Sequence, residues 1–194
     1  VMTGGSFQGI SFESKAATVS YTLAENMTGT VTANEEYEGV YSGTLAFTIP
    51  SEYNTKEKWD AAGINSFEVV FAVSSYQGVT GVATKVPGAQ TLAMSDAWTW
   101  NSGSYANLTT EGTMTSIMDC AKMDWGGSNT LGKIGVQFTN LVGGSEVSYT
   151  IISAKLTGTG EPSTGSGPSG NTTAVNPGEV VSNWDVTNEN VVLS

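Results

Sequence analysis

The chain contains no histidine and no arginine, and it has a single cysteine among its 194 residues. Without histidine there is no Ser-His-Asp or Cys-His catalysis and no histidine-ligated zinc. Without arginine the chain lacks the side chain that most often holds phosphate or carboxylate groups with two parallel hydrogen bonds. A single cysteine forms no disulfide within the chain, so the fold depends on its apolar core. We expect this residue, Cys120, to be a buried and inert thiol because it lies in an apolar, Met-rich stretch.

Charged residues are also scarce and strongly unbalanced. They make up 13% of the chain, which has a formal net charge of −11. Such an excess of negative charge argues against nucleic acid and anionic membranes as partners. It would also repel acidic polysaccharides, so it favours a neutral ligand. No apolar run approaches the roughly 20 residues that a membrane-spanning helix needs.

Glycine, serine and threonine are abundant instead. The sequence has 24 Gly and 48 Ser plus Thr residues, a composition typical of β-rich extracellular domains with many turns. Apolar and polar residues alternate with the period of a β-strand in five longer segments. These are 18–23, 37–49, 66–73, 133–138 and 146–156. Shorter strands are expected near 6–13, 28–33, 79–86, 90–100, 104–110 and 113–119.

Many short strands separated by turns predict an all-β fold, an antiparallel β-sandwich of the jelly-roll type. One short helix is expected over 51–60, directly after Pro50 and with a serine at its start. We expect Trp59 to anchor this helix to the sandwich.

A change in composition divides the chain into parts. Residues 1–160 form the predicted sandwich, and 161–179 are a linker rich in Pro, Gly, Ser and Thr. Residues 180–194, which include Trp184, are apolar again. They are either the start of a following module or an extra strand packed on the sandwich. We expect the chain to be one module of a longer protein.

Tryptophan carries most of the functional information. Trp98 and Trp100 stand in the segment 97–101, where strand spacing would place both rings on one face about 6.6 Å apart. Two rings in a row suit stacking against successive units of an extended sugar chain, because the apolar face of a β-linked glucose packs on an aromatic ring. The alternative is that one ring belongs to the core and the other to the surface.

Other candidate ligand contacts lie in polar segments. Trp125 stands in a polar, glycine-rich loop, where we expect it to contact ligand together with Asp124 and Asn129. The alternative is that Trp125 caps one end of the sandwich. The remaining candidates are residues at the end of a strand or on its non-core face, which would otherwise be solvated: Tyr76, Gln77, Lys133 and Gln137.

No catalytic residue is assigned, and we predict that the protein is not an enzyme. Glycoside hydrolysis needs only two carboxylates, and Glu35, Glu36, Glu38 and Glu68 are available. The first two of these are more typical of a solvated turn. No cofactor is expected, although structural calcium is an alternative for which the sequence offers no assignable ligands.

Two segments carry a resemblance to a known class of proteins. Residues 36–43 (EYEGVYSG) and 47–54 (FTIPSEYN) resemble carbohydrate-binding modules of bacterial plant-cell-wall-degrading enzymes, in particular cellulosomal enzymes of ruminal and gut Firmicutes. The sandwich, the tryptophans, the acidic charge and the linker fit this resemblance, which covers about residues 5–160. It implies a noncatalytic module, secreted to the extracellular space or the bacterial cell surface. Such a module binds β-glucan and holds an attached catalytic domain near plant cell wall.

Three functions are therefore compared. The favoured one is a monomeric module that binds neutral β-1,4-type glucans, such as xyloglucan, mixed-linkage β-glucan or amorphous cellulose, by tryptophan stacking. Its surface is either a flat platform or a cleft. The second is a cell-surface structural or adhesion domain without a glycan site. The third is a small jelly-roll endoglucanase.

Overall fold

The computed structural model describes residues 19–158 and the backbone of Val180 and Val181. The expected strand near 6–13, the linker 161–179 and Trp184 lie outside the described residues. The regular elements are β1 (Val19–Thr32), β2 (Asn34–Tyr37), β3 (Val40–Phe47), η1 (Ser51–Tyr53), α1 (Lys56–Ala62), β4 (Ile64–Ser75), β5 (Gly88–Ser95), β6 (Trp100–Ser102), β7 (Ala106–Asn107), β8 (Met114–Asp119), η2 (Cys120–Lys122), β9 (Leu131–Thr139), β10 (Glu146–Gly158) and β11 (Val180–Val181).

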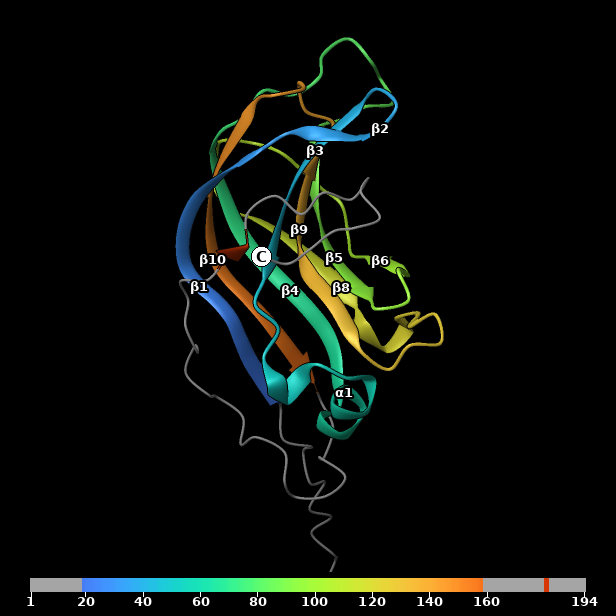
Figure 1. The fold of residues 1–194 in the computed structure, drawn as a ribbon. Coiled ribbons are helices and arrows are strands. Elements are labelled where there is room, and N and C mark those ends of the chain that lie inside the picture. The colour runs from blue at the N-terminus through green and yellow to red at the C-terminus, as the bar shows by residue number, and fades with distance from the viewer. Residues whose placement is uncertain (1–18, 159–179, 182–194) are drawn as a thin grey trace, which may run out of the picture.

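The strands form two antiparallel sheets (Figure 1). One has four strands in the order β1-β10-β4-β8. The other has seven strands in the order β11-β3-β9-β5-β6, with β2 paired to β3 and β7 paired to β5. The predicted antiparallel β-sandwich is confirmed, and α1 is the one α-helix in the part of the chain that the structure describes. None of the described helices has the length and apolar character needed to cross a membrane.

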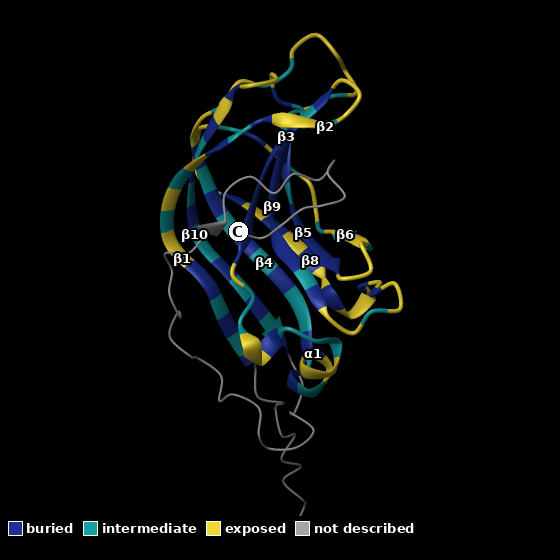
Figure 2. Ribbon diagram, viewed as in Figure 1, coloured by how far each residue is buried: buried dark blue, intermediate teal, exposed yellow. Residues whose placement is uncertain are grey.

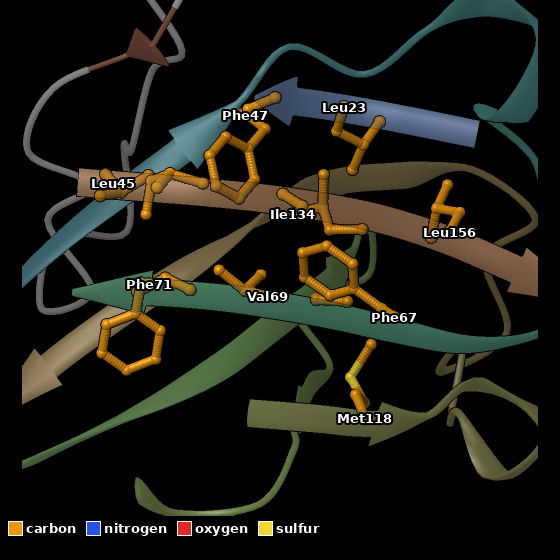
Figure 3. Close-up of a cluster of buried hydrophobic side chains, with 14 of the residues drawn as sticks. Leu23, Leu45, Phe47, Phe67, Val69, Phe71, Met118, Ile134 and Leu156 are labelled. Atoms are coloured by element: carbon orange, nitrogen blue, oxygen red, sulfur yellow. The ribbon is translucent and has the colours of Figure 1, made fainter. Parts of the chain in front are cut away.

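The core lies between the two sheets. Alternation along β4 turns Phe67, Val69 and Phe71 inward, and all three are 0% exposed. The inward residues of β9, including Ile134 and Phe138, are equally buried and face them from the other sheet. Figure 2 shows this alternation of buried and less buried residues along the strands, and Figure 3 shows the apolar side chains between the sheets. The strand period therefore identifies the core face correctly.

Several expected strands have different bounds. The segments 18–23 and 28–33 belong to one continuous strand, β1, which has an irregular register between Thr22 and Ala24. The expected strand 37–49 is a hairpin instead, because β2 ends at Tyr37 and β3 starts at Val40. Gly39, with φ of +75°, allows the left-handed backbone of this turn.

Two further expected strands are shorter or absent. The segment 79–86 contains no strand and forms the loop between β4 and β5. The expected strand 90–100 is interrupted, because β5 ends at Ser95 and β6 starts only at Trp100.

The helix starts and ends at recognisable positions. Thr55 caps α1 through its Oγ1, which accepts a hydrogen bond from the Lys58 N–H at 3.2 Å, and Gly63 ends the helix with φ of +66°. The expected helix over 51–60 is therefore split into η1 and α1. Trp59 is 2% exposed and donates from Nε1 to the carbonyl oxygen of Tyr53 at 2.7 Å. It anchors the helix to the core, as predicted.

The backbone of Val180–Val181 extends the seven-stranded sheet. Val180 lies opposite Phe47, and Val181 lies opposite Ala46, so the pair forms an antiparallel strand beside β3.

Candidate functional site

The seven-stranded sheet has an outer face that points away from the core. On β9 the outward residues alternate with core residues such as Val136 and Phe138. Gln137 is one of these outward residues, and the strand register places it opposite Thr44 on β3 and Gln90 on β5. Directly opposite residues in an antiparallel pair share a face. These three side chains therefore form one row across the sheet, which we call the amide row.

The amide row contains buried polar groups. Nε2 of Gln90 donates to Oε1 of Gln137 at 3.1 Å. Gln137 is 3% exposed and Thr44 is 2% exposed. Among the described residues, neither Nε2 of Gln137 nor Oγ1 of Thr44 has a hydrogen-bond partner. A buried polar group without a partner costs about 1–3 kcal/mol, so a ligand that bonds to these atoms would recover part of that free energy.

A pocket of about 480 Å³ opens beside the amide row, next to the β2–β3 hairpin. Glu36, Tyr37 and Glu38 of the hairpin form one wall, and the β4–β5 loop contributes Lys85 to the other. Gln137 and Gln90 also line this space, which we call the hairpin pocket. Figure 1 shows β2 at one end of the molecule and α1 at the opposite end.

Hydrogen bonds hold the walls of the hairpin pocket in place. The hydroxyl of Ser42 lies 2.8 Å from Oε2 of Glu36 and 2.7 Å from Oγ1 of Thr139. The ammonium of Lys85 donates to the carbonyl oxygen of Gly39 at 2.9 Å, which joins the loop to the tip of the hairpin. The Glu36 carboxylate is therefore fixed at a wall of the pocket, and the two walls are connected.

Trp98 and Trp100 lie near the other end of the same sheet, and we call this pair the tryptophan corner. They are 48% and 39% exposed. The expected strand spacing between them is wrong, because Trp98 lies in the turn between β5 and β6. Its φ is +60°, and its N–H donates to the carbonyl oxygen of Ser95 at 3.0 Å. A bulky residue in the left-handed region costs about 1–2 kcal/mol, and such strain is concentrated at functional sites.

Trp100 shares the outer face with the amide row. The register pairs Trp100 with Met94 on β5, which in turn lies opposite Lys133 on β9. The prediction that Lys133 and Gln137 occupy the non-core face of β9 is confirmed. The alternative that these two side chains are simply solvated is wrong, because they are only 4% and 3% exposed.

Asp124 lies beside the tryptophan corner. Its backbone N–H and carbonyl make two hydrogen bonds of 2.8 Å with the side chain of Asn101 in β6. Its carboxylate is exposed and accepts a hydrogen bond from the Gly126 N–H at 2.8 Å. Asn129 is exposed in the same loop.

The expectation that Trp125 is exposed in this loop is wrong. The side chain is 8% exposed, and its ring packs edge-on against Trp59 at a centroid distance of 5.1 Å. Trp125 therefore belongs to the core at the helix end of the sandwich, which is the alternative role for this residue. Its ring is not available for stacking on a ligand.

Tyr76 and Gln77 follow the end of β4, away from the tryptophan corner. Tyr76 is partly buried, and its hydroxyl donates to the carbonyl oxygen of Leu108 at 3.1 Å. Gln77 is exposed, and its carbonyl oxygen accepts a hydrogen bond from the Val142 N–H at 2.8 Å. The structure thus places Trp98, Trp100 and the backbone of Asp124 beside β6, but it separates Tyr76 and Gln77 from them.

Glu36 and Glu68 do not form a catalytic pair. Glu36 lies on the hairpin beside the seven-stranded sheet. Glu68 lies on the outward face of β4 in the other sheet, opposite Ile117 and Lys155. Because these outer faces point in opposite directions, Glu36 and Glu68 do not face each other across a cleft. Within residues 19–158, no group of three or more His, Cys, Asp and Glu residues is placed to hold a metal ion.

Cys120 is buried, as predicted, with 6% of its surface exposed. Burial raises the pKa of its thiol to about 12, and the nearby Asp119 carboxylate adds to the shift. A thiol held in the protonated form is a poor nucleophile and metal ligand.

Sequence reasoning missed the hairpin pocket. Its lining comes from the hairpin, the β4–β5 loop, β5 and β9, which are far apart in the chain. Gly39 was the one local signal, because an isolated glycine between strand-like segments is typical of a turn. This glycine predicts the turn of the hairpin, but it does not predict which residues of the other segments line the pocket beside it.

No protein-family model matches the chain, and no curated protein resembles it in sequence. Among solved structures, a chain described as "xylan-binding module CBM15" is similar, with 14% identity and a TM-score of 0.41. The match covers 75% of this chain and 99% of that chain. A chain from "Structure of infectious bursal disease virus Gx strain" has 13% identity and a TM-score of 0.28, covering 77% of this chain and 37% of that chain. Both similarities are too distant to identify a ligand for this chain.

Proposed function

We propose that this chain is a noncatalytic module that binds a neutral β-1,4-type glucan on the outer face of its seven-stranded sheet. The observation that carries the proposal is the tryptophan corner. Two large apolar rings are exposed there, and one of them stands on a left-handed backbone. Folding alone gives no reason to keep a strained and exposed tryptophan, whereas ligand stacking does.

The chemistry of the corner suits a sugar ring. The C–H face of a β-linked glucose is apolar and packs on an indole, while its hydroxyl groups at the rim need polar partners. The exposed Asp124 carboxylate beside β6 is such a partner for the rim hydroxyls. Farther along the same face, the partly buried Gln90 carries an amide group near the next part of the sugar chain.

The net charge supports a neutral ligand. At −11 the chain repels phosphate-rich polymers and acidic polysaccharides over the distance of a Debye length. The candidate ligands are xyloglucan, mixed-linkage β-glucan and amorphous cellulose. The affinity is expected to be micromolar or weaker, because a flexible and hydrated glycan loses conformational entropy when it binds. Further parts of the proposal are a monomeric module, an extracellular or cell-surface location, and a catalytic domain tethered in the same polypeptide.

Calorimetric titration with soluble polysaccharides tests this proposal. The panel consists of xyloglucan, mixed-linkage β-glucan, xylan and mannan. The variants Trp98→Ala and Trp100→Ala should bind more weakly while keeping the wild-type far-ultraviolet circular dichroism spectrum and a cooperative unfolding transition in urea. Ile117→Ala is the matched control, because Ile117 is also an exposed apolar residue but belongs to the four-stranded sheet. Absence of binding to every polysaccharide would favour a structural or adhesion domain instead.

A further inference from the structure

Two polar side chains that line the hairpin pocket, Gln137 and Glu36, have hydrogen-bonding capacity that no described residue uses. Gln137 is 3% exposed and lines the pocket, and its Nε2 has no partner among the described residues. The Glu36 carboxylate lines the same pocket and is held by the Ser42 hydroxyl at 2.8 Å. A carboxylate has about four lone-pair sites, so this single bond leaves Glu36 able to accept others.

This pairing of polar groups selects a chemical class of ligand. A carboxylate or phosphate would accept from the Gln137 amide, but the two negative charges of Glu36 and Glu38 outnumber the one positive charge of Lys85 and would repel it. An ammonium group would suit Glu36, but it offers no acceptor to the amide, and the Lys85 ammonium in the lining of the same pocket would repel it. A hydroxyl group both donates and accepts, so adjacent hydroxyls of one uncharged sugar satisfy both sides of the pocket.

We propose that the hairpin pocket is a separate subsite that holds one uncharged sugar unit of the bound polysaccharide, through Gln137 and Glu36, and that Glu36 and Glu38 exclude uronic acid units from it. The inference rests on the proposed function, because the sugar unit arrives as part of the same glycan. Tyr37, which is 64% exposed at the wall of the pocket, offers an aromatic face to that unit.

The subsite is distinct from the tryptophan corner. Gln137 and Lys133 are four residues apart on β9, and Trp100 lies two strands away from Lys133. Strand rise and spacing then place the backbones of Gln137 and Trp100 about 16 Å apart. A glycan that contacts both regions must extend over several sugar units. The pocket therefore takes either a later unit of the main chain or a branch from it.

Nuclear magnetic resonance tests occupancy of the pocket directly. The side-chain NH₂ signals of Gln137, identified by their loss in Gln137→Leu, are followed during titration of the wild-type chain with cellohexaose. We expect them to shift with the same saturation curve as the Trp100 indole signal. If Gln137→Leu does not fold, the same signals are assigned through bonds from the backbone. Trp100 signals that shift while the Gln137 signals stay unmoved would overturn the subsite and leave the proposed function intact.

A pair of cellulose derivatives with the same degree of substitution but different charge tests the exclusion of acidic sugars. Hydroxyethyl cellulose and carboxymethyl cellulose with equal degrees of substitution differ mainly in the charge of their side groups. In Glu38→Gln, binding of the carboxymethyl polymer should strengthen by roughly threefold or more relative to the hydroxyethyl polymer, and this gain should shrink at high salt. Glu111→Gln makes the same change in net charge at an exposed position outside the pocket and should leave the ratio unchanged.

The outcomes separate the two proposals. An unchanged ratio in Glu38→Gln, or an equal change in Glu111→Gln, would overturn charge exclusion by the pocket. No binding of cellohexaose or of either polymer, together with no binding to the polysaccharide panel, would overturn the proposed function and the subsite with it.

Discussion

Replacing Trp100 with alanine should weaken glycan binding by an amount that follows from its exposed surface. A tryptophan side chain buries roughly 150–250 Å² in its contacts, and Trp100 is 39% exposed, so about 60–100 Å² is open to a ligand. A sugar ring that stacks on one face covers about half of this area. At about 25 cal/mol per Å², the lost contact amounts to about 0.8–1.2 kcal/mol. The dissociation constant should therefore rise about four- to eightfold.

The assay is calorimetric titration of Trp100→Ala and wild type with the polysaccharide of the panel that binds most tightly. Ile117→Ala removes an exposed apolar side chain from the other sheet and should leave the dissociation constant within about twofold of wild type. A native circular dichroism spectrum for each variant separates lost contact from lost fold. An unchanged affinity in folded Trp100→Ala would refute the stacking argument.

The other predictions concern stability. Trp125→Ala should lower the free energy of unfolding by about 3–5 kcal/mol in urea titrations, because it removes a buried ring packed against Trp59; a loss below about 1 kcal/mol would contradict the core assignment. Burial raises the pKa of Cys120 from 9.0 to about 12. Between pH 9 and pH 12 the thiol therefore ionises in the unfolded chain but stays protonated in the folded one. The free energy of unfolding should fall as the pH rises through this range. Cys120→Ala should reduce that slope in urea titrations across this pH range, and an identical slope would argue against a buried thiol. Gly135→Ala should destabilise the fold by at least about 1–3 kcal/mol, because the added Cβ would meet the backbone carbonyl oxygen of Leu45; wild-type stability in the same titration would show that β3 and β9 are not so close.

The sandwich was predictable from sequence because the alternation of apolar and polar residues along a strand indicates which of its faces is buried. Alternation identifies the core faces of β4 and β9, where Phe67 and Phe138 are both 0% exposed. It does not report where a strand stops. The Trp-Thr-Trp pattern of residues 98–100 is typical of a strand, yet hydrogen bonds from Ser95 and Trp98 close a turn there. Strand ends depend on such local bonds, which composition does not reveal.

The candidate site was less predictable because it depends on contacts between distant segments. Trp125 lies in a polar loop, but its partner Trp59 is on α1, and nothing local indicates that contact. Lys133 and Gln137 were assigned to the correct face, but their burial results from neighbouring strands. Predicting the hairpin pocket would have required the relative positions of four separate segments of the chain. The type of each residue indicates which chemical groups a site has available, and the fold determines which of these groups lie close together.

Titration of the wild-type chain with soluble xyloglucan and mixed-linkage β-glucan tests the central claim most directly. We predict saturable binding in the micromolar range or weaker to at least one of these neutral glucans, with no release of reducing ends on long incubation. An absence of heat and of any spectral change with every neutral glycan of the panel would contradict it. The exposed rings of Trp98 and Trp100 would then belong to a surface for a different partner.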